Sequence, residues 1–249
     1  APYLRQSFVR SGMPVATILL YAFRNTFLLA SCSIIIALFL GLFLGVISAL
    51  NKDTFIDNLI LLISVLGMSL PSFFASIIIA WLFGFILHEY TGLNMTGSLY
   101  EVDDYGRGSF LQVRNLILPA ITLGIRPLSV IIQLCRNSLL EVLAMDYVRT
   151  AISKGLSRFI VIFKHALRNA LNPVITSISG WFASMLAGAV FVEYIFAWNG
   201  IGKEIVDALN KMDLPLVMGA VLLISSVFVI INIMVDLIYW YLDPRIRLS

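Results

Sequence analysis

The most constraining feature of this chain is a long run without a single charged residue, from Thr26 to Leu50. As a helix, such a run can cross the ~30 Å hydrocarbon core of a bilayer, which takes about 20 apolar residues. A second uncharged run follows at 58–87, where Pro71 is expected to kink the helix. The chain is 60% hydrophobic and has a mean hydropathy of +0.96. We therefore predict a membrane protein.

The predicted fold is all-α and polytopic, because no segment alternates in polarity over the ~10 residues of a membrane β-strand. The expected spans are 26–50, 58–87, 116–136, 169–192 and 214–240. Together they form one transmembrane domain at 22–241. An external or interfacial segment at 1–21 precedes this domain, and a tail at 242–249 follows it.

The distribution of Lys and Arg orients these spans, since cytoplasmic loops carry an excess of both. The interval 136–168 holds six basic residues and the tail adds Arg245 and Arg247, so we place the loop and the C-terminus in the cytoplasm. Five crossings then put the N-terminus outside. Either a missing first helix or trimming of the chain would account for an exported N-terminus that starts with Ala1.

The cytoplasmic loop, at 141–171, has the pattern of an amphipathic element. At 100° per residue, its apolar side chains gather on one side of a helix and its basic side chains on the other. One interpretation is a helix lying on anionic lipid. The other is two short helices joined at Gly155, which lowers helix stability by roughly 1 kcal/mol, and such a pair would dock another protein.

The residues of this loop, "DYVRTAISKGLSRFIVIFKHALRNALNP", resemble the cytoplasmic loop of permease subunits in binding-protein-dependent ABC importers. Within that family they are most similar to the oligopeptide, dipeptide and nickel group. "LGMSLPSFF", "FVEYIFAWNGIG" and the terminal "DPRIR" agree. The general Glu-Ala-Ala signature is only partly kept, because Arg149, Thr150 and Ala151 occupy its places before Gly155.

The resemblance implies a type I ABC importer transmembrane domain with a six-helix core, in the inner membrane of a bacterium. It implies a second homologous permease subunit, two cytoplasmic ATP-binding subunits and a periplasmic or lipid-anchored solute-binding protein as partners. The ATPase-coupling residues would be Asp146, Thr150, Ala151, Lys154, Gly155, Leu156 and Arg158. This sequence contains no G-x-x-x-x-G-K-[ST] phosphate-binding loop, so ATP is expected to be hydrolysed by the partner subunits.

Enzymatic, metal-binding and nucleic-acid-binding functions find no support in the sequence. His88 and His165 are predicted on opposite sides of the membrane, which excludes a metal pair. No cofactor is indicated, and the net charge of +3 is too small for a general nucleic-acid binder.

Three residues are candidates for the translocation pathway: Arg126, Pro71 and Trp198. Arg126 could instead bond carbonyl groups freed by Pro127, or reach water through a local defect. Outside the membrane, a short helix is expected at 202–211, after a tight turn at Gly200 and Gly202.

The predicted function is that of a permease subunit forming half the pathway of an ATP-driven importer for oligopeptides or dipeptides. The alternative from another class is a secondary transporter driven by an ion gradient, which would need carboxylates near the midplane. Within the family, nickel and glutathione importers remain alternatives for the substrate.

Overall fold

The computed structural model describes residues 4, 6–10, 12–102 and 108–242. The predicted tail, including Arg245 and Arg247, therefore lies almost wholly outside the described residues. The chain forms two compact units. Unit 1 comprises residues 1–33, 71–123 and 182–249, and unit 2 comprises residues 34–70 and 124–181.

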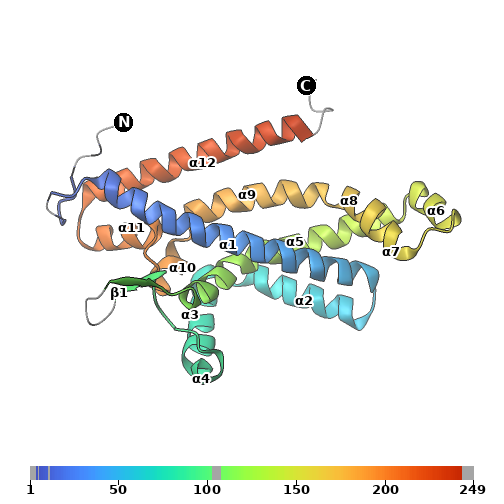
Figure 1. The fold of residues 1–249 in the computed structure, drawn as a ribbon, viewed down its shortest axis with the longest axis horizontal. Helices are drawn as coiled ribbons and strands as arrows, with labels where there is room; N and C mark the ends of the chain where they lie inside the picture. Colours follow the sequence, from blue (N-terminus) through green and yellow to red (C-terminus); the bar gives the residue numbers. More distant parts are fainter. Residues whose placement is uncertain (1–3, 5, 11, 103–107, 243–249) are drawn as a thin grey trace. The chain divides into compact units, whose positions relative to one another are not determined.

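Three helices are long and apolar enough to cross a membrane. They are Val15–Leu50, which is α1, Arg114–Leu143, which is α5, and the segment Leu214–Val235 of α12, which itself extends to Leu242. A fourth crossing results if α2 (Phe55–Ser69) and α3 (Ser72–Trp81) are counted as one broken span. Figure 1 shows the course of these helices. The spans predicted at 26–50, 116–136 and 214–240 therefore correspond to long apolar helices.

The predicted kink in the second apolar run is confirmed at Pro71. The backbone of Leu70 and Pro71 is extended, and Pro71 directly precedes α3. Proline restricts the residue before it to extended conformations, so α2 ends there. At the other end of α2, the Thr54 hydroxyl caps the helix by accepting a hydrogen bond from the amide of Asp57.

The expected span at 169–192 is divided in the structure. The π-helix η2 (Val161–Ala166) runs into α8 (Leu167–Ala170), α9 (Asn172–Gly188) follows, and α10 (Val190–Ile195) begins after a break at Ala189. With 17 residues, α9 is at the lower limit of the roughly 17 to 25 residues that a crossing takes. A crossing by this segment stays a prediction.

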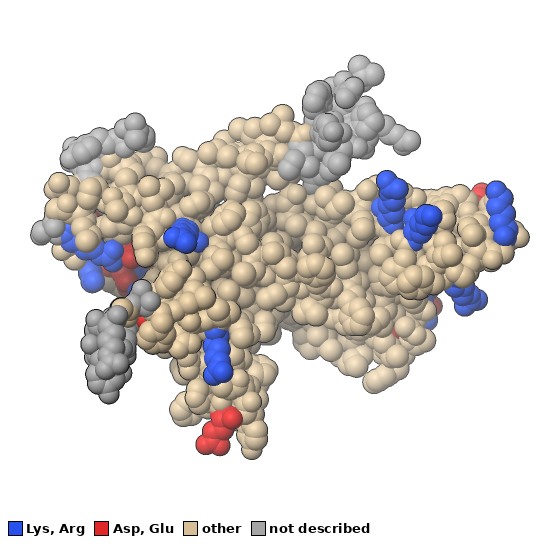
Figure 2. All heavy atoms as spheres, in the orientation of Figure 1, with Lys and Arg blue, Asp and Glu red and all other residues tan. Residues whose placement is uncertain are grey.

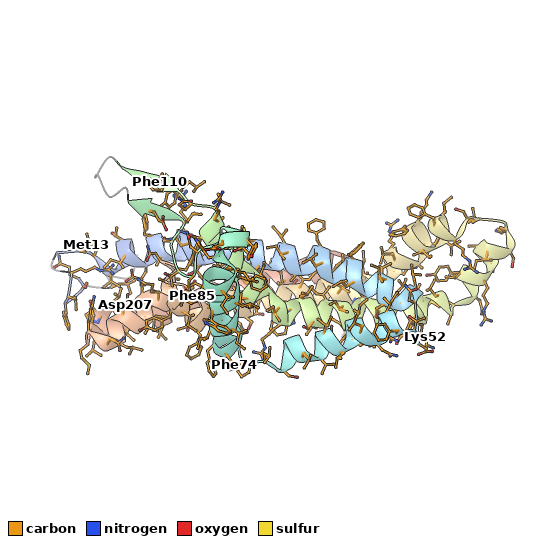
Figure 3. The ribbon with its side chains drawn as sticks, turned by 90° about the horizontal axis from the view of Figure 1, so that it is seen from below. Met13, Lys52, Phe74, Phe85, Phe110 and Asp207 are labelled. Carbon is orange, nitrogen blue, oxygen red and sulfur yellow. The ribbon has the colours of Figure 1, made fainter. Side chains whose placement is uncertain are left out.

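Besides the start of α1, unit 1 contains several short helices and a β-hairpin. The π-helix η1 (Leu82–Ile86) and α4 (His88–Thr91) extend α3, and Figure 3 labels Phe74 and Phe85 along this arm. A hairpin pairs β1 (Tyr100–Val102) antiparallel with β2 (Ser109–Leu111), with Tyr100 opposite Leu111. This hairpin and an isolated antiparallel bridge between Gln6 and Pro14 are the β-structure among the described residues. The core of the unit joins α1, α11 (Ile201–Asn210) and α12 through Leu19, Ile201 and Leu216.

Unit 2 joins the second half of α1, α2, the second half of α5, the loop helices and the start of α9. Its core contains twelve buried residues: Ala37, Val46, Ala49, Ile131, Cys135, Leu139, Val142, Val148, Val161, Ala166, Ala170 and Val174. One hydrophobic core thus holds α1 and α5 of this unit together with the loop that follows α5.

Candidate functional site

The loop at 141–171, which is predicted to couple to an ATPase, contains a helix, a glycine turn and a second helix, the arrangement that the docking interpretation predicts. The first helix, α6, covers Asp146–Ser153, and the second begins as α7 at Arg158–Ile160 and continues through η2. Gly155 has a φ of +81°, a conformation that costs other residues roughly 1–2 kcal/mol. Apart from the adjoining residues of the chain, no atom lies within 4 Å of a Cβ built there. The backbone conformation therefore favours glycine here, and close packing within this chain does not require it.

Buried aliphatic side chains fix the loop to unit 2. Val148 of α6 and Val161 of η2 are 1% and 2% exposed, and both belong to the core that contains Leu139 of α5. The hydroxyl of Tyr147 accepts a hydrogen bond of 2.8 Å from the Asn169 side chain, which ties α6 to α8. The loop is thus packed against the spanning helices of its own unit.

The seven predicted coupling residues lie together on this loop. Ala151 is half-buried and the others are exposed: Asp146, Thr150, Lys154, Gly155, Leu156 and Arg158. The predicted apolar face divides in two, because Val148 points into the core while Ile152 and Phe159 are 54% and 69% exposed. Figure 2 shows basic side chains over the same end of the unit. The loop therefore exposes apolar side chains as well as cationic groups.

A buried ion pair lies just before the loop, and sequence reasoning missed it. Asp57, 1% exposed, receives hydrogen bonds of 2.7 Å from both Nε and Nη2 of Arg136. It also accepts from the hydroxyl of Ser48 and from the amide of Asp53, the latter at 2.9 Å. The pair joins the end of α1, the start of α2 and α5. Asp57 and Arg136 are 79 residues apart, and no pattern along the chain indicates that they pair.

The translocation candidates have different surroundings. Arg126 is exposed on α5, and its guanidinium has no hydrogen-bond or ion-pair partner among the described residues. Pro71 is exposed at the start of α3. Trp198 is fully buried in unit 1, where its indole N–H donates to the carbonyl of Asn25 at 3.1 Å. Trp198 is thus packed within its unit, and a role in the pathway stays a prediction.

A second group of contacts that was not predicted from the sequence is centred on Glu193, just beyond the expected span 169–192. Its carboxylate is fully buried and accepts hydrogen bonds from the Thr26 hydroxyl at 2.7 Å and from the amide of Gly202 at 2.6 Å. Burial raises the pKa of Glu193 to about 7, although these hydrogen bonds oppose the shift. The carboxylate fastens the turn before α11 to α1.

The predicted helix at 202–211 is confirmed as α11, although its glycines serve close packing instead of an unusual turn conformation. Gly200 has a negative φ, and a Cβ on it would overlap the carboxylate of Glu193. A Cβ on Gly202 would overlap the Cα of Val190. Both glycines therefore allow the segment before α11 to approach α10.

A cavity of about 590 Å³ opens on unit 1 beside α11. Arg10, Asn25, Tyr100, Asn199 and Glu204 are among the residues that line it. The guanidinium of Arg10 pairs with the Glu204 carboxylate at 2.9 Å, which joins the N-terminal segment to α11.

Asp213, after α11, also binds the N-terminal segment. Burial alone would raise the pKa of Asp213. Hydrogen bonds from the Ser7 hydroxyl and from the amides of Phe8 and Val9 stabilise the carboxylate more strongly, so the net effect is a lowered pKa.

The long apolar helices, two of which (α1 and α5) share one core with an exposed helix–turn–helix loop, define a polytopic membrane protein. Residues 41–248 match the family described as the inner membrane component of binding-protein-dependent transport systems, and the chain belongs to that family. This membership confirms the resemblance identified from the loop sequence.

Curated relatives agree with the family. The chain is 37% identical over 228 residues to a dipeptide transport system permease protein of Alkalihalophilus pseudofirmus, covering 86% of this chain and 68% of the relative. It is 36% identical to the dipeptide transport system permease protein of Escherichia coli K12, covering 96% and 75%. The Bacillus subtilis protein of the same name is 39% identical, covering 91% and 68%.

Solved structures support the fold. A chain of the MetNI methionine ABC transporter in an inward-facing conformation superposes with a TM-score of 0.67 at 14% identity, covering 92% of this chain and 97% of that one. A chain of an amino acid ABC transporter gives a TM-score of 0.62 at 12% identity, covering 92% and 94%. At such identities the likeness shows the fold alone.

Proposed function

We propose that this chain is a permease subunit of an ATP-driven importer for dipeptides or short oligopeptides and forms half of the pathway through a bacterial inner membrane. The observation that carries this proposal is the exposed loop, attached by its own core to the spanning helices of a chain from this family. The names of the curated relatives favour dipeptides over nickel or glutathione.

The loop has the chemistry of a protein-docking element. Ile152, Phe159 and Phe163 are 54%, 69% and 46% exposed, and the rings of the two phenylalanines lie 4.6 Å apart. Exposed aromatic and aliphatic side chains act as anchors in partner pockets. The cations around them favour an acidic rim on that partner. We assign this surface to a cytoplasmic ATP-binding subunit, and two such subunits would serve the pair of permeases.

The outer face would receive a solute-binding protein. The N-terminal segment, the hairpin and α11 of unit 1 surround the 590 Å³ cavity and present Arg10, Lys203 and Glu204 together. These mixed charges suit a rim contact with a partner that must also leave after delivery. With the loop on the inside and this face on the outside, the C-terminus would be cytoplasmic.

Substitutions of Gly155 test the docking. Gly155→Leu should leave the protein in the membrane but reduce co-purification of the ATP-binding subunits and peptide uptake, because leucine resists a φ of +81°. Gly155→Asn is the matched control, since asparagine tolerates this conformation, and it should retain most of both.

A lipid-surface role predicts a different order. Leucine at position 155 would then strengthen membrane association, and Lys164→Gln would weaken it. Full retention of the ATP-binding subunits by Gly155→Leu would contradict the docking proposal.

A further inference from the structure

The spanning helices of unit 2 expose two chemically different kinds of surface. Between residues 34 and 50, every exposed side chain of α1 is apolar: Ile35, Phe39, Leu40, Phe43 and Leu50. The exposed side chains of α2 after its first turn are also apolar until Ser69 ends the helix: Leu59, Leu62, Ile63, Val65, Leu66 and Met68. Such surfaces suit contact with lipid tails.

The exposed residues on the outward face of α5 are polar. Between residues 124 and 143 they are Arg126, Asn137 and Glu141, and the half-buried Gln133, Val130 and Leu140 lie on the same side of the helix at 100° per residue. The opposite side packs Cys135 into the core at 0% exposure. An apolar helix with one exposed polar side indicates that this side meets water and not lipid.

The start of α9 shows the same tendency. Its exposed residues up to Gly180 include Asn172 and Thr176 as well as Ile175, while Val174 is buried in the core that α5 also enters. Both helices that flank the coupling loop therefore expose polar groups within their apolar stretches, whereas α2 exposes them only near its two ends, at Asn58 and Ser69.

Arg126 stands out on the polar face of α5. Arg136, ten positions later, has the Asp57 carboxylate as its partner, whereas Arg126 has no acceptor among the residues that the structure describes. A guanidinium without a partner inside a spanning helix requires water, a solute or a second protein. Its five donors in a planar fork match a carboxylate with two parallel hydrogen bonds.

We propose that this face of α5 lines the water-filled pathway and that Arg126 binds the C-terminal carboxylate of a peptide in passage. This inference rests on the proposed function. The side-chain amides of Gln133 and Asn137 can donate to and accept from peptide groups. A terminal carboxylate and peptide groups are present in every peptide. This face of α5 would therefore bind peptides as a class, without selecting among their side chains.

Cysteine accessibility tests the pathway wall. In a background with Cys32→Ser and Cys135→Ala, single cysteines replace Gln133, Asn137 or, as lipid-facing controls, Phe39 and Ile63. A membrane-impermeant charged thiol reagent should modify the α5 positions at least about tenfold faster than the controls, because thiolates form in water and not in lipid. Equal, slow labelling would overturn the assignment, whether lipid or a second permease covers this face.

Uptake tests the carboxylate site. In proteoliposomes holding the full complex, Arg126→Gln should lower ATP-driven uptake of dialanine at least about tenfold, while Arg126→Lys keeps a charge and part of the uptake. Arg24→Gln, at another exposed arginine of a long helix, is the matched control and should transport normally. Unchanged uptake by Arg126→Gln would overturn the carboxylate role. If the unaltered complex itself takes up no peptide, the proposed function fails instead.

Discussion

The Asp57–Arg136 pair allows a quantitative prediction about stability. Asp57 is 1% exposed and the side chain of Arg136 is 14% exposed, and they share two hydrogen bonds of 2.7 Å. Removing one member of a buried pair leaves an uncompensated charge and costs about 3–5 kcal/mol, whereas replacing both by apolar groups is often close to neutral. Arg136→Met should therefore lower the free energy of unfolding by that amount.

A double-mutant cycle separates the pair from its surroundings. The four proteins are the parent, Arg136→Met, Asp57→Leu and the double variant, each unfolded by denaturant in detergent with fluorescence detection. The double variant should be more stable than Arg136→Met alone, because no charge is left buried without a partner. Additive losses in the double variant would show that the two groups are not coupled and would refute this reasoning.

Three further predictions concern two buried residues of unit 1 and the orientation of the protein in the membrane. Because the folded pKa of Glu193 is raised from 4.5 to about 7, stability should fall as pH rises between these values, and Glu193→Gln should remove the slope in thermal unfolding measured at pH 5 and pH 8. Trp198→Phe loses the bond to the Asn25 carbonyl and should cost about 1–3 kcal/mol in chemical denaturation; no loss would contradict the buried contact. An impermeant thiol reagent should label Ser157→Cys only from the cytoplasm and Ser98→Cys only from outside, and reversed labelling would overturn the orientation.

Sequence patterns predicted the elements governed by local chemistry. The uncharged run at 26–50 lies within α1, the break at Pro71 follows from the steric restriction before proline, and Gly155 marks a left-handed turn between two helices. α11 was also predicted, at 202–211, although the tight turn expected at its glycines was not what those residues serve. Each of these depends on residues that are neighbours along the chain.

Features that depend on distant residues could not be predicted in this way. Asp57 meets Arg136 only after α1, α2 and α5 pack, and Glu193 meets Thr26 across 167 positions. Gly202 was expected to form a tight turn, but it serves close packing. This also depends on a contact formed by packing, since a side chain at Gly202 would overlap the backbone of α10. The division of the loop's apolar residues between core and surface likewise required the position of the spanning helices.

The most direct test of the central claim is peptide uptake by proteoliposomes that hold this chain with its second permease, ATP-binding subunits and solute-binding protein. Labelled dialanine should accumulate only with ATP inside the compartment that contains the ATP-binding subunits. Collapse of proton and sodium gradients by ionophores should leave this uptake unchanged. Uptake that continues without ATP and stops when the gradients collapse would contradict the account and favour a secondary transporter.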